Sequence, residues 1–164
     1  EFRRVLFRSQ FSQCIDEMAK DYDTVLISMI GYDIQQGFDK QYRNKGYRIV
    51  SSGTRNDPYF LNRQRDLMEL ADMTISNNIG THIGYSICLG TPHYIFNQDI
   101  TSIKKAASAQ ASDHLQAIRD REYAEIKAVF NSREPIITPE QIAVVKKYWG
   151  PFEIKPKFYA NTQE

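Results

Sequence analysis

The sequence predicts an α/β fold, a Rossmann-like parallel sheet with helices on both faces, followed by C-terminal helices. Three observations predict it in the 164 residues. Short apolar runs rich in β-branched residues alternate four times with helical patterns, the connections between them are short, and only helical patterns follow residue 112. The expected strands are residues 24–30, 47–52, 73–76 and 93–96.

The first strand and helix have clear boundaries. Residues 24–30 (TVLISMI) form a continuous apolar run, which is typical of a buried parallel strand, and Gly31 ends it. Asp33 is expected to cap the next helix, and Gly46 stands where a left-handed C-cap belongs. The buried stripe of this helix is expected to be Ile34, Phe38 and Tyr42.

The next helix follows the strand at 47–52. Asp57 is a good N-cap residue, and Pro58 suits the first helical turn because it lacks a backbone N–H. The expected inner face consists of Phe60, Leu61, Leu67, Met68 and Ala71. Arg63 and Arg65 are expected on the outer face. A short helix at 81–89 then connects the last two strands, and His93 opens the last of them.

The region after residue 112 is expected to be helical. Its first helix carries one long apolar stripe, composed of Leu115, Ile118, Tyr123, Ile126, Val129 and Phe130. Residues 138–141 (TPEQ) form a capping box that opens a last helix, which ends near Trp149. Its apolar stripe is larger than a lone surface helix needs and consists of Ile142, Val145, Tyr148 and Trp149. We expect this stripe to be partly exposed.

These patterns divide the chain into four segments. Residues 1–9 (EFRRVLFRS) contain Glu-Phe, which a common restriction site encodes, and a translation of a sequencing adapter, so we interpret them as a cloning or sequencing-adapter artefact. The alternative is a basic amphipathic arm. Residues 10–98 form the expected nucleotide-sugar-binding domain, 99–111 a linker and 112–164 the C-terminal helical region and tail. We expect the natural protein to continue on the N-terminal side.

Charge and cysteine content exclude several classes of protein. Without three arginines and one glutamate of residues 1–9, 18 basic residues face 19 acidic ones, which disfavours a nucleic-acid-binding protein. The two cysteines, Cys14 and Cys88, lie in separate apolar stretches and favour a reducing compartment. No apolar run reaches the roughly 18–20 residues of a membrane span. We expect a cytoplasmic protein, or one peripheral to the inner face of the membrane.

Three loops at the carboxyl ends of the strands are candidates for a site, because open parallel sheets bind ligands there. The first loop is 31–33 (GYD), after the first strand. After the second strand the candidates are Ser52, Gly53 and Arg55. After the third strand the candidates are Ser76, Asn77, Asn78, Gly80, Thr81, His82 and Tyr85.

The loop after the third strand suits a phosphate best, because it leads directly into a helix N-terminus. His82 is the expected phosphate contact, and Gly80 lets a phosphate approach the backbone. The alternative is that Asn78 or Thr81 only caps the helix. His93 is expected to be structural, at the end of its strand away from the cleft, and His114 to be solvated. No GxGxxG, P-loop or His-Glu-x-x-His motif occurs.

Residues 71–95 (ADMTISNNIGTHIGYSICLGTPHYI) resemble the donor-binding signature of GT-B glycosyltransferases, and residues 26–53 resemble its preceding strand, helix and strand. The similarity covers about residues 23–98 and is strongest at Gly80 and at 89–92 (LGTP). The sequence, especially residues 76–85 (SNNIGTHIGY), is also similar to transferases that assemble bacterial capsule and surface polysaccharides. The resemblance implies a nucleotide-sugar donor, a saccharide or glycolipid acceptor, and a missing N-terminal domain of the same chain.

One departure from that family affects the mechanism. Retaining members of the largest such family carry two glutamates eight positions apart, where this chain has Asn77 and Tyr85. Neither side chain is a carboxylate, so we expect an inverting, metal-independent transferase without a further cofactor. Its general base is expected in the missing domain, and no catalytic residue can be named here.

Three other functions share the same pattern. A GT-B-like nucleotide-sugar epimerase and a polysaccharide pyruvyl transferase use a similar half-domain. A non-catalytic assembly module is consistent with the missing glutamate pair.

Overall fold

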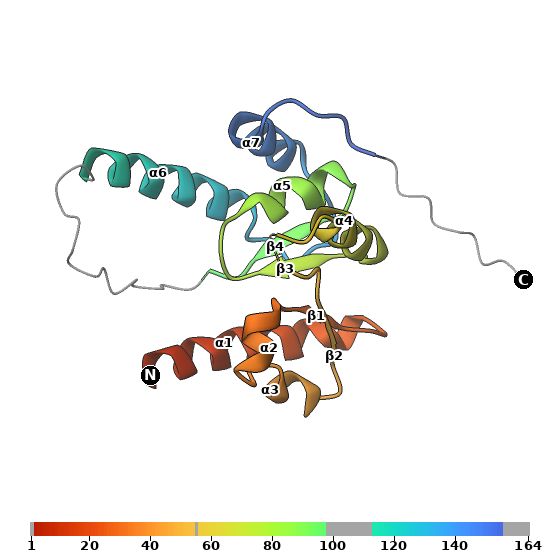
Figure 1. Cartoon of the computed structure of the whole chain (residues 1–164). Coiled ribbons are helices and arrows are strands. Elements are labelled where there is room, and N and C mark those ends of the chain that lie inside the picture. Colours follow the sequence, from red (N-terminus) through yellow and green to blue (C-terminus); the bar gives the residue numbers. More distant parts are fainter. Residues whose placement is uncertain (1, 55, 98–112, 156–164) are drawn as a thin grey trace, which may run out of the picture. The chain divides into compact units, whose positions relative to one another are not determined.

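The computed structural model describes residues 2–54, 56–97 and 113–155 of the chain (Figure 1). The chain divides into two compact units, residues 1–67 and 68–164. Both are mixed α/β, and each contains one parallel two-stranded sheet. The expected linker at 99–111 lies outside the described residues.

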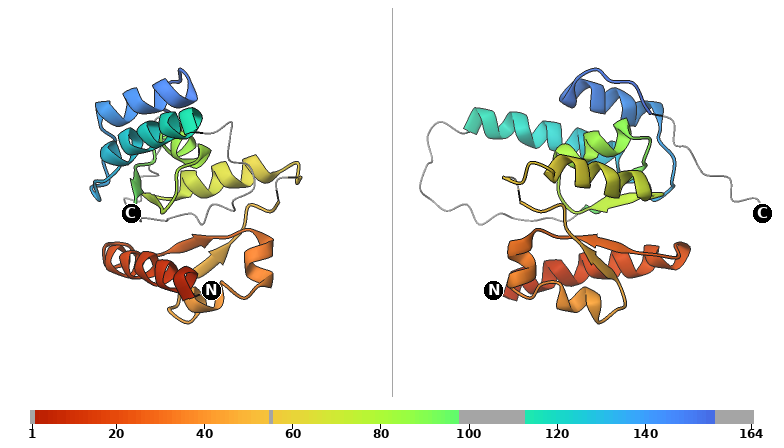
Figure 2. Two further views of the ribbon diagram at one scale, coloured as in Figure 1. Left: turned by 90° about the vertical axis from the view of Figure 1, so that its left-hand side faces the viewer. Right: turned by 45° about the vertical axis from the view of Figure 1, so that its right-hand side comes forward.

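Unit 1 consists of a strand pair with helices beside it (Figures 1 and 2). Strands β1 and β2 pair in parallel, with Ile27 opposite Ile49. The elements of unit 1 are α1 (Phe2–Met18), the 3-10 turn η1 (Ala19–Asp21), β1 (Leu26–Ser28), α2 (Gly31–Gln35), α3 (Lys40–Arg43), β2 (Arg48–Val50) and the start of α4 (Phe60–Leu70). Helix α1 therefore includes most of the segment that we set aside as an artefact.

The prediction of a buried first strand was wrong. Strand β1 is three residues long, and Leu26 is 38% exposed. Ile30, at the end of the same apolar run, is 52% exposed. An apolar run predicts a buried strand only when other elements cover both faces of the sheet, and in this structure the two-stranded sheet leaves these side chains uncovered.

The helix expected at 33–46 is interrupted. Gly37 has a φ of +75°, which ends α2 and separates it from α3. Asp33 lies inside the first turn of α2, whose N-cap is Ile30, so the predicted Asp33 cap was wrong. Gly46 has a φ of +84°, which confirms the left-handed conformation predicted there.

Polar contacts join α1 to the start of β2. Lys45 forms an ion pair with Asp16, and its Nζ donates to Ser12 Oγ at 2.7 Å. Tyr47 Oη donates to Asp16 Oδ1, also at 2.7 Å. Burial and the neighbouring Asp16 carboxylate raise the pKa of Tyr47 to about 12. The second half of α1 thus belongs to the packing of unit 1.

Unit 2 contains the second strand pair, with α5 against it and α7 packed on both α5 and α6 (Figure 2). Its strands pair in parallel, with Ile75 opposite Tyr94. The elements are the end of α4, β3 (Thr74–Ser76), α5 (Thr81–Cys88), β4 (His93–Ile95), α6 (Asp113–Val129) and α7 (Pro139–Trp149). The bounds of β3, α5 and β4 agree with the prediction within one residue.

The core of unit 2 brings α5, β4, α6 and α7 together. Its buried members are Ile83, Ile87, Ile95, Ile126, Phe130, Val144 and Val145. A Cβ added to Gly84 would lie 3.0 Å from Trp149 Cγ, so the glycine allows the indole ring to approach α5 closely. Trp149 packs against this core. The stripe of the last helix is partly exposed, as expected: Val145 is buried, whereas Ile142, Tyr148 and Trp149 are only partly buried against the core.

Other predictions for the helices were partly right. The capping box is present: Thr138 Oγ1 accepts from the Gln141 N–H at 3.3 Å, and Gln141 Oε1 accepts from the Thr138 N–H at 3.1 Å. In α4, Leu61 is 58% exposed although it was expected on the inner face. In α6, Ile118 and Tyr123 are also exposed, because the core contacts the C-terminal part of this helix.

Candidate functional site

The loop after β3 leads directly into α5 and contains seven of the predicted site residues. Gly80 is the N-cap of α5, with an extended backbone and no side-chain cap hydrogen bond. The alternative that Asn78 or Thr81 caps this helix is therefore wrong. As the N-cap, Gly80 supplies no side chain to the backbone N–H groups of the first helical turn, and these groups lie at the positive end of the helix dipole, which favours an anion.

Gly80 also makes room for a histidine. A Cβ added at Gly80 would lie 2.9 Å from Nδ1 and 3.1 Å from Cε1 of His82. A larger residue at this position would therefore displace the imidazole ring. Thr81 and Tyr85 are exposed on α5, and Asn78 is exposed in the loop.

Hydrogen bonds of side chains in β3 and β4 hold the loop after β3. Ser76 Oγ, at the end of β3, donates to the Asn78 carbonyl at 2.8 Å. Ser76 Oγ also lies 3.0 Å from His93 Nε2, and Thr74 Oγ1 lies 2.8 Å from His93 Nδ1. His93 is thereby bound on both ring nitrogens by side chains of β3.

His93 is buried and begins β4 opposite Thr74, the first residue of β3, so it starts at the end of the sheet away from the loop, as predicted. Its side chain nevertheless extends along the sheet towards the loop. Its ring contacts Ser76 at the carboxyl end of β3, and its centroid lies 5.5 Å from that of His82. Burial, with a smaller effect of His82, lowers the pKa of His93 to about 3. The ring is therefore neutral at neutral pH.

His82 has a partly buried ring beside the loop. Burial lowers the pKa of His82, and its hydrogen bond to the Asn78 backbone partly opposes this effect. Nε2 is buried and has no hydrogen-bond partner among the described residues. His82, in the first turn of α5, thus has a buried polar atom that no described residue satisfies.

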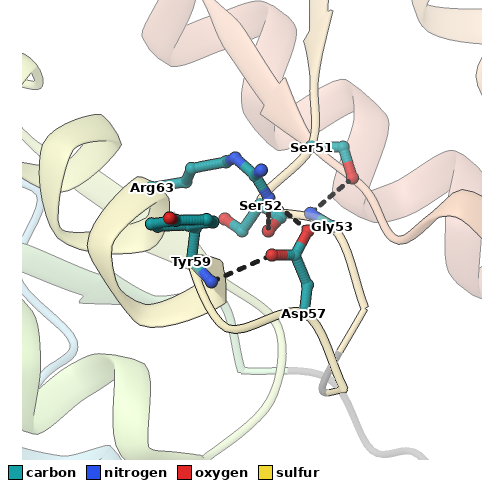
Figure 3. Close-up of polar contacts among 6 residues, drawn as sticks. All are labelled: Ser51, Ser52, Gly53, Asp57, Tyr59 and Arg63. Carbon is teal, nitrogen blue, oxygen red and sulfur yellow. Dashed lines mark hydrogen bonds and ion pairs between the residues drawn. The ribbon is translucent and has the colours of Figure 1, made fainter.

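The loop after β2 contains the remaining predicted residues (Figure 3). Ser52 is buried, and its carbonyl accepts from Arg63 Nη1 at 3.4 Å. Gly53 has a φ of +92°, and its N–H donates to Ser51 Oγ at 3.1 Å. Arg55 lies outside the described residues. Ser52 and Gly53 belong to unit 1, whereas the seven residues after β3 belong to unit 2.

An ion pair that the sequence did not indicate holds this loop (Figure 3). Arg63 Nη1 donates to Asp57 Oδ2 at 2.5 Å, and its guanidinium lies 5.9 Å from the centre of the Tyr59 ring. Asp57 Oδ1 accepts from the Tyr59 N–H at 2.9 Å. Because α4 begins at Phe60, this bond lies in the turn before the helix, whereas the sequence predicted that Asp57 caps the helix itself. The hydrogen bonds from Arg63 and from this N–H lower the pKa of Asp57.

Arg63 lies on the exposed face of α4, as expected, with its side chain 45% exposed, and it also reaches back to the loop. The six-residue spacing between Asp57 and Arg63 is a weak signal, because the geometry of the turn between them decides whether they meet. Because its charge is paired with Asp57, Arg63 contributes to the conformation of the loop more than to anion binding. A Cβ at Gly53 would lie 2.9 Å from Asp57 Oδ2, so this pair also requires glycine there.

The described residues contain neither a cluster of metal-binding side chains nor a helix that could span a membrane. No group of three or more His, Cys, Asp or Glu side chains is close enough together to hold a metal ion in residues 2–54, 56–97 and 113–155. In the same residues, no helix has the length and apolarity that a membrane span requires.

Comparison with protein-family models, with curated proteins and with solved structures gives no match for this chain.

Proposed function

We propose that the chain is the donor-binding half of a glycosyltransferase, which holds a nucleotide-sugar while its sugar is moved to a polysaccharide or glycolipid acceptor. The observation that carries the proposal is the N-terminus of α5. The helix follows a parallel strand and has Gly80 as its N-cap, which supplies no capping side chain. The resemblance of residues 71–95 to GT-B glycosyltransferases supports the same assignment, with a Rossmann-like domain around the loop.

In this proposal the phosphates of the donor lie at the first turn of α5. The backbone N–H groups and the helix dipole stabilise the negative charge that develops on the leaving nucleotide. Asn77 and Tyr85 stand at the positions of the two glutamates of retaining enzymes, and an amide and a phenol cannot replace these carboxylates. We therefore propose an inverting reaction, in which an acceptor hydroxyl attacks the anomeric carbon without a metal ion.

Ligand-observed NMR with UDP, GDP, ADP, CDP and CMP tests the proposal, because it detects even millimolar binding. We expect one nucleotide to bind in preference to the others. Thr81→Glu places a carboxylate in the exposed first turn of α5, where it favours the helix but repels a phosphate. We expect this substitution to weaken nucleotide binding at least about tenfold, or by about 1.4 kcal/mol.

The matched control is Ala143→Glu, which adds the same charge at an exposed position of α7. This variant is expected to bind as the unsubstituted chain does. Absence of binding by a folded chain, or equal effects of the two substitutions, would contradict the proposal and favour an assembly module. Product analysis of the reaction separates glycosyl transfer from epimerisation and pyruvyl transfer.

A further inference from the structure

A cavity of about 340 Å³ lies at the amino ends of the two strands of unit 1. Its walls come from Ala19 in η1, from residues 22–25 before β1, and from residues 45–48, which lead into β2. Ser52 and Gly53 follow β2, so the cavity is at the opposite end of this sheet from their loop. Small-molecule sites in proteins have volumes of roughly 300–1,000 Å³, so the cavity is large enough for one small ligand.

Backbone hydrogen bonds hold the walls of the cavity together. The Arg48 N–H donates to the Val25 carbonyl at 3.1 Å, which joins the segment before β1 to the start of β2. The Tyr22 N–H donates to the Ala19 carbonyl at 3.3 Å, which joins the same segment to η1. The walls are therefore formed in the absence of a ligand.

Three polar side chains on these walls are available for a ligand. Asp23, Thr24 and Arg48 are exposed, and none of them forms an ion pair or a side-chain hydrogen bond with another described residue. Lys45 also lines the cavity, but its charge is paired with Asp16. The cavity thus offers one carboxylate, one hydroxyl and one guanidinium that have no partner in the described part of the chain.

These groups differ in what they can bind. A carboxylate only accepts hydrogen bonds, and a guanidinium only donates them. An anion that contacts Arg48 would be repelled by Asp23, and a cation that contacts Asp23 would be repelled by Arg48. A hydroxyl group both donates and accepts, so neighbouring hydroxyls of one neutral ligand satisfy both side chains.

Two tyrosines indicate the shape of such a ligand. Tyr22 and Tyr47 line the same cavity, and tyrosine combines a large apolar ring with a polar tip. Tyr47 uses its hydroxyl to donate to Asp16 Oδ1 at 2.7 Å, which leaves its ring as the part that a ligand can contact. A sugar ring has hydroxyls at its edge and apolar C–H groups on its faces, and so matches both kinds of wall.

We propose that this cavity is a saccharide-binding site, in which hydroxyl groups of one sugar ring donate to Asp23 and accept from Arg48. The inference goes beyond the proposed function, because the nucleotide contact of that function is the N-terminus of α5 in unit 2. The contacting groups are exposed to water, which competes for the same hydrogen bonds. We therefore expect dissociation constants on the order of millimolar.

Amide chemical-shift mapping of the ¹⁵N-labelled full chain tests the proposal. The probes are the methyl glycosides of glucose, galactose, mannose and N-acetylglucosamine, and glycerol at the same concentration is the control for a hydroxyl-rich solute without a ring. We expect at least one glycoside to shift the amides of residues 22–25 and 45–48 in a saturable manner, and glycerol to leave them unchanged. No shift with any glycoside, or an equal shift with glycerol, would overturn the inference.

Two substitutions remove the proposed contacts one at a time. We expect Asp23→Ala and Arg48→Met each to weaken glycoside binding about fivefold or more, because each removes a hydrogen bond to a charged group. Asp21→Ala and Lys40→Met are the matched controls, since each removes an exposed charge of unit 1 that does not line the cavity. The control variants are expected to bind as the unsubstituted chain does. Equal weakening in all four variants would contradict a contact with Asp23 and Arg48.

Other ligand classes are tested in the same titration. Inorganic phosphate reports on a plain anion site at Arg48, and L-alanine reports on a site for a zwitterion. Tighter binding of either one than of every glycoside would show that the saccharide assignment is wrong. A chain that binds a glycoside but no nucleotide would contradict the proposed function and support this inference, whereas binding of a nucleotide without a glycoside would do the reverse.

Discussion

The two units contain the same kind of element, a parallel strand pair with helices, but they are stabilised differently. In unit 2 all three residues of β4 are buried, and seven apolar side chains from four elements form its core. In unit 1 the middle residue of β1 is only partly buried, and the other two are exposed. Among its described side chains, the apolar ones below a tenth exposed are Cys14, Ile15 and Tyr42.

This difference shows that a strand-helix-strand pattern does not determine how completely a unit is packed. The apolar run of β1 is longer than that of β4, yet its side chains are more exposed. The two strands differ in exposure because helices cover β4: α5 packs against it, and α7 packs on α5 and α6. In unit 1 the ion pair and hydrogen bonds of Asp16 contribute to the attachment of α1.

The largest expected effect is the loss of a core ring in unit 2. Phe130 is 0% exposed, so we expect Phe130→Ala to lower the free energy of unfolding by about 3–5 kcal/mol. Urea denaturation followed by the fluorescence of Trp149, the single tryptophan, measures it. The control is Leu61→Ala in α4, an exposed leucine, for which we expect a change of about 0.5 kcal/mol or less. Similar losses of unfolding free energy in the two variants would contradict the conclusion that the core of unit 2 is packed more completely than unit 1.

A pH effect is expected in unit 2 because His93 is buried there. Unfolded chains bind a proton at an ordinary histidine pKa of 6.5, whereas the pKa of folded His93 is about 3. The unfolded state therefore binds more protons between these values. Stability is fully present above about pH 6.5 and falls as the pH drops towards 3, with a loss of roughly 2 kcal/mol at pH 5.

Urea denaturation at pH 7 and pH 5 checks this expectation. The control is His93→Gln, which keeps an N–H for Ser76 but does not titrate. We expect this variant to lose less stability between the two pH values, with a remaining decrease from His82, whose pKa is also lowered. An equal pH dependence of both proteins would show that His93 is not the responsible group.

The smallest expected effect concerns the polar contacts of unit 1. Asp16 is desolvated, which raises its pKa, but the hydrogen bonds from Lys45 and Tyr47 outweigh this effect and lower it. Lys45 and Asp16 are both more than a third exposed, so solvent screens their ion pair. We expect Lys45→Met to cost about 0.2–1 kcal/mol, measured by amide hydrogen exchange of α1.

Arg48→Met is the matched control for this substitution. Arg48 is an exposed cation of the same unit, and its guanidinium has no ion pair among the described residues. We expect no change in the exchange of α1 amides in this variant. Faster exchange in both variants would mean that net charge, and not the contact with Asp16, stabilises α1.

Much of the local structure could be predicted from the sequence. The bounds of β3, α5 and β4, the capping box at Thr138 and the left-handed Gly46 depend on nearby residues, and all were predicted. The loop after β3 was also recognised, because a strand followed by small polar residues and a helix is a local pattern. The contacts of His93 with Thr74 and Ser76 were not predicted, because they join side chains of two separate strands.

The sequence by itself therefore determined the α/β class, the positions of most helices and strands, and the location of the candidate site. These follow from periodicity, capping and backbone preferences, which act within a few residues. Only the tertiary structure decided that β1 stays uncovered while β4 is buried, that Trp149 packs on Gly84, that Arg63 pairs with Asp57, and that His82 Nε2 is buried without a hydrogen-bond partner among the described residues. Each of these depends on side chains brought together from separate elements, and burial and hydrogen-bond satisfaction are properties of such assemblies.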